Sequence, residues 1–192
     1  MSKILDFVKE NKLEQVNLHL GCGGMRLKDW VNIDLYDFEE HDTSRTGSDY
    51  DVKMDIRTLD TPDDCVDAIL LVHVVEHFVR WETIQMINHY YNKLRTGGKL
   101  IVEMPDLDKI IEWYLKGKLG KHIDTPLGPL NKGFTQFYGN QWSGIDFETH
   151  RYVWTKSEFH QVLASVGFSQ INITNEAKFH EPDRDMFVIA QK

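Results

Sequence analysis

A strand-like apolar run that ends in a glycine-rich turn limits the folds that this chain can adopt. Residues 16–24 read Val-Asn-Leu-His-Leu-Gly-Cys-Gly-Gly, and a second apolar run, residues 31–34, ends in an acid. Glycine has no Cβ, so Gly21 and Gly23 let the backbone turn sharply and approach a ligand closely. Ligands of parallel α/β sheets bind at the carboxyl ends of the strands. An acid there can accept two hydrogen bonds from a ribose diol, so the two segments indicate a nucleoside cofactor.

Alternating strand and helix patterns predict a parallel α/β sheet. Strands are expected at residues 16–20, 30–35, 50–54, 65–72 and 99–104. The first two strands are joined by too few residues for a helical crossover, which takes about a dozen, so the first helix should be a stub or a loop. A helix over residues 81–94 should end at Thr96-Gly97-Gly98, a glycine C-cap signal. Asp106 is expected to cap the next helix, which runs to about Lys116.

The regular alternation stops at residues 117–150, which are rich in Gly, Pro, Asn and aromatic residues. A segment of this length without periodicity is usually functional, so we expect a substrate-side insertion. Thr155-Lys-Ser-Glu158 has the form of a capping box and predicts the start of a helix that Gly167 ends. Residues 168–174 and 185–191 follow as two strands with no helix between them, which indicates an antiparallel pair.

Composition indicates one globular domain over residues 1–192 and disfavours several partners. The formal net charge is −8, with 30 acids against 22 bases, which argues against a broad surface for nucleic acid or anionic lipid. No apolar run approaches the roughly 20 residues that a membrane span requires, and the N-terminus lacks the apolar stretch of a signal peptide. Cys22 and Cys65 form no Cys-x-x-Cys pair, so a reducing cytoplasmic setting is expected. The sequence leaves the oligomeric state open.

The glycine turn departs from the dinucleotide fingerprint, because Arg26 occupies the third glycine position and Asp34 comes too early. Leu-Gly-Cys-Gly-Gly followed by a near acid resembles the class I S-adenosylmethionine-dependent methyltransferases, in particular a branch of small bacterial and phage enzymes similar to the type 11 methyltransferase domain. Residues 71–78 and 94–105 resemble the segment after the fourth strand and the fifth-strand segment of that family. The resemblance covers about the whole chain. It implies a Rossmann-like sheet of seven strands in the order 3-2-1-4-5-7-6, with the last strand antiparallel and helices on both faces.

The resemblance also implies a cofactor, S-adenosyl-L-methionine, whose product is S-adenosyl-L-homocysteine. Asp34 would bind the ribose hydroxyls, Asp55 the adenine amino group, with Ile56 against the ring, and His73 would lie beside the methionine part. Asp34 and Asp55 could instead be turn acids or caps, and His73 a buried histidine satisfied by the backbone. The full set of expected cofactor residues is Leu20, Gly21, Cys22, Gly23, Asp34, Leu35, Asp55, Ile56 and His73.

The acceptor side is predicted from residues after the fourth strand and around the insertion. An oxygen or nitrogen acceptor has to lose a proton, and histidine suits that task near neutral pH. The candidate bases are His77 and His150, which could instead be a cap and a surface residue. Tyr138 and Trp142 could line the acceptor site or form the core of the insertion. Arg151 could bind an anionic group or form an ordinary ion pair.

The segment His73-Val-Val-Glu-His77 also matches the His-x-x-Glu-His pattern of one peptidase class. That zinc site needs both histidines on one helical face, whereas His73 here is expected to end a strand. Some methyltransferases carry Glu-x-x-Glu-His at this position and bind a divalent ion. Because His73 replaces the first glutamate, a hard oxygen ligand is lost, and the sequence predicts no metal.

Three functions remain open from the sequence. The first is methyl transfer to a small-molecule or sugar-like acceptor. A nicotinamide-dependent oxidoreductase is the second, against which Arg26 and the two closing strands argue. The third is a nucleotide-binding module without catalysis. Cofactor binding separates the first function from the second, and only turnover separates the first from the third.

Overall fold

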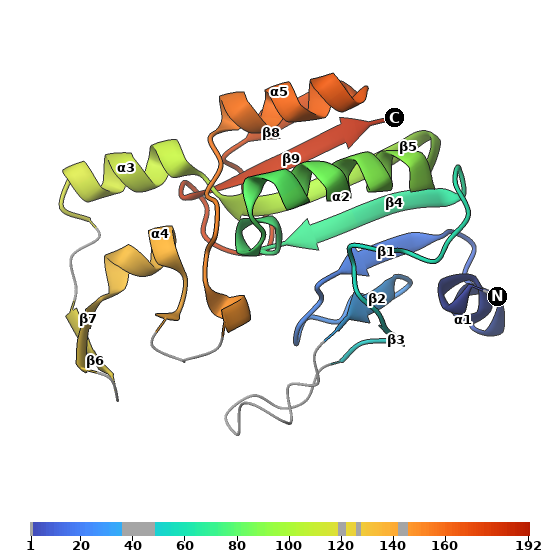
Figure 1. Ribbon diagram of the computed structural model, residues 1–192, viewed down its shortest axis with the longest axis horizontal. Coiled ribbons are helices and arrows are strands. Elements are labelled where there is room, and N and C mark those ends of the chain that lie inside the picture. The colour runs from blue at the N-terminus through green and yellow to red at the C-terminus, as the bar shows by residue number, and fades with distance from the viewer. Residues whose placement is uncertain (1, 36–48, 119–121, 126–127, 142–145) are drawn as a thin grey trace.

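The computed structural model describes residues 2–35, 49–118, 122–125, 128–141 and 146–192 (Figure 1). The helices and strands, in chain order, are α1 (Lys3–Glu10), β1 (Asn17–Leu20), β2 (Val31–Asp34), β3 (Val52–Lys53), β4 (Val66–Val72), α2 (Arg80–Lys93), β5 (Leu94–Pro105), α3 (Leu107–Leu115), β6 (His122–Thr125), β7 (Gly128–Asn131), α4 (Thr135–Tyr138), α5 (Lys156–Val166), β8 (Ser169–Thr174) and β9 (Asp185–Gln191). Three short 3₁₀ helices are η2 (Val75–His77), η3 (Lys132–Phe134) and η5 (Asp146–Glu148).

Seven strands form one sheet in the order β3-β2-β1-β4-β5-β9-β8. The pairs from β3 to β5 are parallel, whereas β9 runs antiparallel to both β5 and β8. The order is that of the predicted fold, with β9 as the seventh strand and β8 as the sixth, so the fold prediction is confirmed. The parallel strands point toward the side on which α4 lies, and α2 and α5 lie side by side over the sheet (Figure 1).

The short β1–β2 connection is held by one buried side chain rather than by a helix. The Asn32 amide donates to the carbonyls of Leu27 and Trp30 at 3.0 and 3.2 Å, and its oxygen accepts from the Leu27 N–H at 2.8 Å. Asn32 is fully buried, so these bonds replace water for both the loop and the side chain. No helix lies between β1 and β2 within residues 21–30, as predicted.

The predicted end of α2 is wrong. The helix stops at Lys93, and Thr96, Gly97 and Gly98 belong to the long strand β5. Leu94 is fully buried and pairs with Val66, and the register between β4 and β5 then shifts. A Cβ on Gly98 would lie 2.9 Å from the Arg95 carbonyl oxygen. This glycine therefore permits a close backbone approach within an irregular strand and does not cap a helix.

The predicted caps of α3 and α5 are present. The Asp106 side chain accepts from the Asp108 N–H, and the Thr155 hydroxyl accepts from the Glu158 N–H, both at 3.1 Å. The Glu158 carboxylate does not return to Thr155, as a full capping box requires, because it contacts Arg80 and Tyr152. Gly167 ends α5 in the left-handed conformation, as expected.

Among its described residues, the segment between α3 and α5 includes an antiparallel strand pair, β6 and β7, and short helices (Figure 1). It returns to the sheet through residues 149–154, where Trp154 is fully buried and its carbonyl accepts from the Leu107 N–H at 2.9 Å. The helices that follow β4 and this returning segment therefore meet at the carboxyl edge of the sheet. Among the described residues, no helix has both the length and the apolar character required to cross a membrane.

Candidate functional site

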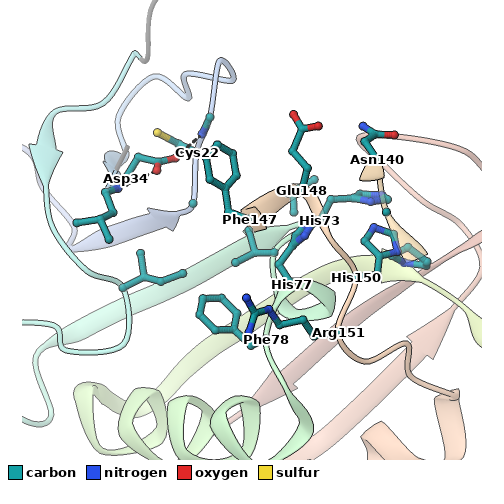
Figure 2. A pocket seen from close by; sticks show the side chains of 18 of the residues that line it. Cys22, Asp34, His73, His77, Phe78, Asn140, Phe147, Glu148, His150 and Arg151 are labelled. Atoms are coloured by element: carbon teal, nitrogen blue, oxygen red, sulfur yellow. Dashed lines mark hydrogen bonds between the residues drawn. The ribbon is translucent and has the colours of Figure 1, made fainter. Parts of the chain in front are cut away.

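A cavity of about 750 Å³ opens at the carboxyl edge of the parallel strands. Its wall is built from the turn after β1, the end of β2, the residues after β3 and β4, the segment from α4 to His150, and the β8–β9 connection. This is the edge at which open α/β sheets bind ligands. Figure 2 shows Asp34 and Cys22 on one side of the cavity, Phe147 beside them, and His73, His77 and His150 farther along it.

The glycine turn is fastened to β2 by its backbone and by Asp34. Gly21 and Gly23 both have positive φ, +66° and +52°, which glycine adopts without a Cβ clash. The N–H groups of Gly21 and Cys22 donate to the Ile33 carbonyl, and the Gly23 N–H donates to Asp34 Oδ2 at 2.8 Å. The turn is thus held against the strand that ends in the acid, with both on the cavity wall.

Cys22 lines the cavity as a neutral thiol. Its side chain is buried, and that burial, with the nearby Asp34 carboxylate, raises the pKa of Cys22 to about 12. A thiol reacts as the thiolate, which this environment disfavours near neutral pH. Cys22 is therefore a small wall residue and not a nucleophile.

Asp55 and Arg57, which both line the cavity, form an ion pair. Two guanidinium nitrogens of Arg57 donate to Asp55, at 2.6 Å for Nη2 to Oδ2 and 3.0 Å for Nε to Oδ1. The Arg57 hydrogen bonds lower the pKa of Asp55 below its ordinary value. Ile56 lies between them in sequence, is buried, and also lines the cavity. The sequence interpretation did not anticipate the arginine partner.

His73 lies between two carboxylates. Its Nε2 contacts Asp185 Oδ2 at 3.0 Å, and its Nδ1 lies 3.1 Å from Glu76 Oε1. Burial by itself lowers the pKa of His73, but the Asp185 bond and the Glu76 contact outweigh burial and raise it to about 9. His73 has φ of +52°, an unusual backbone conformation that directs this side chain from the end of β4 into the cavity wall.

His77 and His150 come together although 72 residues separate His77 from the neighbouring Thr149. Their ring centroids lie 5.0 Å apart in an edge-to-face arrangement (Figure 2). His77 Nδ1 donates to the Thr149 carbonyl at 3.2 Å, and His150 Nδ1 donates to the Gln136 carbonyl at 3.0 Å. Burial lowers the pKa of His150, so this ring is neutral near pH 7. Since a carbonyl only accepts, each ring carries a proton on Nδ1, and the Nε2 lone pair is left in the neutral form of the ring.

Glu76, directly before His77, is buried beside histidines that compensate its charge. Its side chain is 1% exposed, and neither carboxylate oxygen receives a hydrogen bond from a described residue. The His73 Nδ1 atom is near Oε1, but the geometry of that contact is not that of a hydrogen bond. Burial raises the pKa of Glu76, whereas the neighbouring histidines, His73 first, lower it to about 2. Glu76 is therefore an ionised carboxylate that is buried from solvent.

The β8–β9 connection adds His180 and Arg184 to the wall, and the sequence interpretation missed both. The buried Glu103 carboxylate organises this connection by accepting backbone N–H bonds from Lys178, Phe179 and His180 at 2.6 to 3.2 Å. The His180 ring then lies 4.2 Å from the His73 ring. Because β9 is antiparallel to both β5 and β8, the carboxyl end of β8 lies at the same sheet edge as the carboxyl end of β5. The predicted strand order could therefore have indicated that the β8–β9 connection reaches the cavity.

The structure gathers most of the predicted site residues around one cavity, but not all of them. Gly21, Cys22, Gly23, Asp34, Leu35, Asp55, Ile56, His73, His77, His150 and Arg151 line it. Leu20 is fully buried in the core, and Tyr138 is 59% exposed; neither is on the cavity wall. Trp142 lies outside the described residues. Arg151 contacts Asp146 at 2.5 Å, so the ordinary ion pair considered for it is present.

A protein-family model described as a methyltransferase domain matches residues 2–173. The chain belongs to the S-adenosylmethionine-dependent methyltransferases. The match includes the glycine turn, Asp34 and the segment after β4. The cofactor of this protein is S-adenosylmethionine. The alternative prediction of a nicotinamide-dependent oxidoreductase is therefore not retained. A search among curated proteins found no significant match.

Solved methyltransferase structures share the fold of this enzyme at low sequence identity. A methyltransferase from Archaeoglobus fulgidus has a TM-score of 0.58 at 14% identity, covering 98% of this chain and 93% of that one. A possible histamine N-methyltransferase from Thermotoga maritima has a TM-score of 0.58 at 15% identity, covering 98% and 89%. Human N-acetylserotonin methyltransferase has a TM-score of 0.57 at 17% identity, covering 93% of this chain and 47% of that one.

The described cavity suits the cofactor in size and in polar groups. Cavities that bind small molecules and cofactors have volumes of about 300–1,000 Å³, and this one lies within that range. The glycine turn and the Asp34 and Asp55 carboxylates all line it, so it presents both close backbone and acceptor oxygens to a nucleoside ligand. The cofactor supplies an activated methyl group, so the protein has mainly to align donor and acceptor.

Proposed function

We propose that this methyltransferase modifies an oxygen or nitrogen atom of a small, polar, sugar-like acceptor. The observation that carries the proposal is the continuity of one cavity, which runs from Asp34 and Asp55 to His77 and His150. A cofactor whose nucleoside lies against the two acids would direct its methyl group toward the histidines. The acceptor would then enter beside His150, under the segment that contains η5.

The wall around the acceptor end supports a polar ligand. Gln136, Asn140, Glu148 and Arg151 line it. The aromatic ring of Phe147 lies nearer to Cys22 and Asp34 on the same cavity (Figure 2). Amide and carboxylate groups can bond hydroxyl and amino groups of an acceptor, and an aromatic ring can cover its apolar face. The net charge of −8 disfavours a nucleic-acid acceptor. The names of two structural neighbours contain small molecules, histamine and N-acetylserotonin, although their likeness to this chain concerns the fold alone.

His77 and His150 are the groups that we propose to activate the acceptor. Each ring donates its Nδ1 proton to a backbone carbonyl, which fixes the ring and directs the Nε2 lone pair elsewhere. When bound, S-adenosylmethionine would supply the activated methyl group and keep the bonding electron pair on its sulfur. One Nε2 atom would take the proton that leaves the acceptor oxygen or nitrogen.

The test has two stages. Thermal unfolding with S-adenosylhomocysteine, and with NAD and NADP in parallel, measures the nucleoside site, because a ligand at 100 times its Kd stabilises a fold by about 2.7 kcal/mol. Release of S-adenosylhomocysteine is then followed with panels of sugars, polyols, phenols and amines, and with RNA and DNA for comparison.

We expect stabilisation by S-adenosylhomocysteine alone and turnover with a hydroxylated or amino compound. Turnover only with nucleic acid would contradict the small-molecule proposal. Stabilisation without turnover on any panel would favour a module that binds the cofactor and does not catalyse.

A further inference from the structure

We propose that Glu76, His77 and His150 form a site for one divalent transition-metal ion at the acceptor end of the cavity. Each of the three residues offers a ligand atom, and these atoms all lie within 4.8 Å of one another. Zinc bonds to histidine nitrogen and carboxylate oxygen measure about 2.0–2.2 Å, so two ligands at a tetrahedral angle lie about 3.4 Å apart. Side-chain rotations that bring the ligand atoms closer by up to about 1.4 Å would bring the cluster to coordination distances.

The carboxylate of Glu76 gives the first independent reason for an ion. It is 1% exposed and receives no hydrogen bond from any described residue at either oxygen. Buried charges are normally paired or coordinate metals. His73 Nδ1 lies 3.1 Å from Oε1, whereas no described residue donates a hydrogen bond to Oε2. An ion beside Oε2 would supply a partner for that oxygen.

The hydrogen bonds of the two histidines give the second reason. A histidine that binds a metal through one nitrogen almost always donates its other N–H to a carbonyl, a carboxylate or water. His77 and His150 each donate Nδ1–H to a backbone carbonyl, from Thr149 and Gln136. Among the described residues no partner occupies either Nε2 atom. Both rings are therefore held in the tautomer that a metal ligand requires.

The three ligands are fastened together by the backbone, although they come from distant segments. The Glu76 carbonyl accepts from the N–H groups of Arg151 and Tyr152, at 2.7 and 3.2 Å. This contact joins η2, which contains Glu76 and His77, to the residue directly after His150. A site whose ligands are already positioned requires little rearrangement when an ion binds.

A second group, His73, Glu103 and His180, also has three ligand atoms close together, but its atoms are already engaged. Both ring nitrogens of His73 contact carboxylates, from Glu76 and Asp185. The Glu103 carboxylate accepts from three backbone N–H groups. This second group therefore serves as an internal comparison in which no ion is expected.

The ligand set favours a particular class of ion. Two imidazoles and one carboxylate suit Zn²⁺, Fe²⁺, Co²⁺ or Ni²⁺, whereas Mg²⁺ and Ca²⁺ prefer oxygen ligands. Three protein ligands leave a coordination position open toward the cavity, as in catalytic zinc sites. With both Nε2 atoms on the ion, neither histidine accepts a proton, and the ion would activate a hydroxyl acceptor in their place by lowering the pKa of its oxygen ligand. Only this last step rests on the proposed function, since ion binding itself does not depend on it.

The experiment measures metal binding directly. Chelator-treated protein without cofactor is titrated with Co²⁺, followed by its visible absorption, and with Zn²⁺ by calorimetry; Mg²⁺ serves as a control ion. We expect one tightly bound transition-metal ion per chain and no comparable binding of Mg²⁺. His150→Ala and Glu76→Gln should each weaken binding at least tenfold. His180→Ala, in the second group, and His160→Ala, on the exposed face of α5, should leave it unchanged.

Several results would overturn the inference. They are the absence of stoichiometric binding, equal binding by the His150→Ala protein, or loss of binding only in His180→Ala. Because Glu76→Gln could fail to fold, His150→Ala decides the outcome, with its far-UV circular dichroism as the check on folding. S-adenosylhomocysteine affinity is measured on the same samples. Loss of metal with cofactor binding intact refutes the metal site alone, whereas absent cofactor binding refutes the proposed function.

Discussion

The Asp34 carboxylate accepts a hydrogen bond from the Gly23 N–H at 2.8 Å, so the acid at the end of β2 holds the glycine turn that follows β1. The other oxygen, Oδ1, accepts from the Leu35 N–H at 2.7 Å. Asp34 is 8% exposed, and that small surface lies on the cavity wall. One side chain therefore both shapes the turn and presents a carboxylate to the cavity, where we propose that the ribose binds.

The two roles of Asp34 predict different effects for two substitutions. Asp34→Ala removes the turn bond and the proposed ribose contacts, so stability and cofactor affinity should both fall. Asp34→Asn keeps an oxygen for the Gly23 N–H but turns its NH2 group toward the Leu35 N–H, so stability should fall by less than in Asp34→Ala while the charged contacts are lost. Hydrogen bonds to charged groups contribute about 1.5–3 kcal/mol, which corresponds to about 10–100-fold weaker S-adenosylhomocysteine binding.

Calorimetric titration with S-adenosylhomocysteine measures that affinity, and urea unfolding measures stability. Asp183→Asn, a similar change at an exposed position in the β8–β9 connection, is the control. If Asp34→Asn folds and binds like the original protein, the ribose assignment is wrong.

The backbone conformation of Gly139 allows residues 148–150 to pack closely against it on the cavity wall. Its φ of +74° and ψ of −169° lie in a region that is essentially restricted to glycine. A Cβ there would lie 2.0 Å from the Glu148 carbonyl oxygen and 2.6 Å from the His150 nitrogen. Gly139→Ala should therefore push residues 148–150 away from α4, lower stability by about 2–4 kcal/mol, and separate His150 from His77.

The matched control for this change is Gly117→Ala. Gly117 also has a positive φ, +67°, but a Cβ there would meet no atom within 4 Å. Its cost should be limited to backbone strain of about 1–2 kcal/mol. Urea unfolding compares the free energies of unfolding of the two variants. Equal destabilisation would show that the contact with residues 148–150 does not contribute to stability.

The strands and the cofactor edge could be predicted because they depend on local patterns. The apolar run of β4, the acid after β2 and the positive-φ glycines are each readable from neighbouring residues. The end of α2 could not be read in this way, because Leu94 leaves the helix to pair with Val66, and that pairing is a long-range contact. The two glycines that resemble a helix cap instead serve an irregular strand.

The acceptor side was harder to predict for the same reason. His77 and His150 were each recognised as candidates, but nothing in the sequence indicated that their rings meet or that Glu76 lies beside them. The contact depends on how residues 149–152 return to η2, which is set by backbone hydrogen bonds to the Glu76 carbonyl. Arg57, His180 and Arg184 were missed because their place follows from partners in other segments.

We expect the β8–β9 connection to depend on Glu103 for its rigidity. All of its acceptor capacity toward this loop is met by backbone N–H donors, so Glu103→Gln would turn an amide N–H₂ toward donors that need an acceptor. We expect a loss of about 2–3 kcal/mol and faster hydrogen exchange at Lys178, Phe179 and His180. Glu181→Gln, at an exposed position in the same loop, is the control. Unchanged exchange in Glu103→Gln would contradict the positioning role.

Asp185 predicts part of the acid sensitivity of the fold. Its carboxylate is fully buried and contacts His73 at 3.0 Å and Arg184 at 2.6 Å, with His180 close by. Burial raises the pKa of Asp185, but the bonds from His73 and Arg184 outweigh burial and lower it to about 2. A depressed pKa stabilises the native state above the unfolded value of about 3.9, and this contribution is lost as the pH falls toward the folded value.

Asp185→Asn should therefore lower the free energy of unfolding near pH 7 by about 3–5 kcal/mol, because the His73 and Arg184 charges lose their buried partner. The protein should unfold at a correspondingly lower urea concentration. The difference between the two proteins should shrink as the pH is lowered from about 5 toward about 2.5, since the unfolded chain takes up the proton in that window. Urea unfolding at a series of pH values measures this convergence. A difference that stays constant across the window would show that Asp185 keeps its ordinary pKa in the folded protein, and the ion contacts would then have no linkage to acid stability.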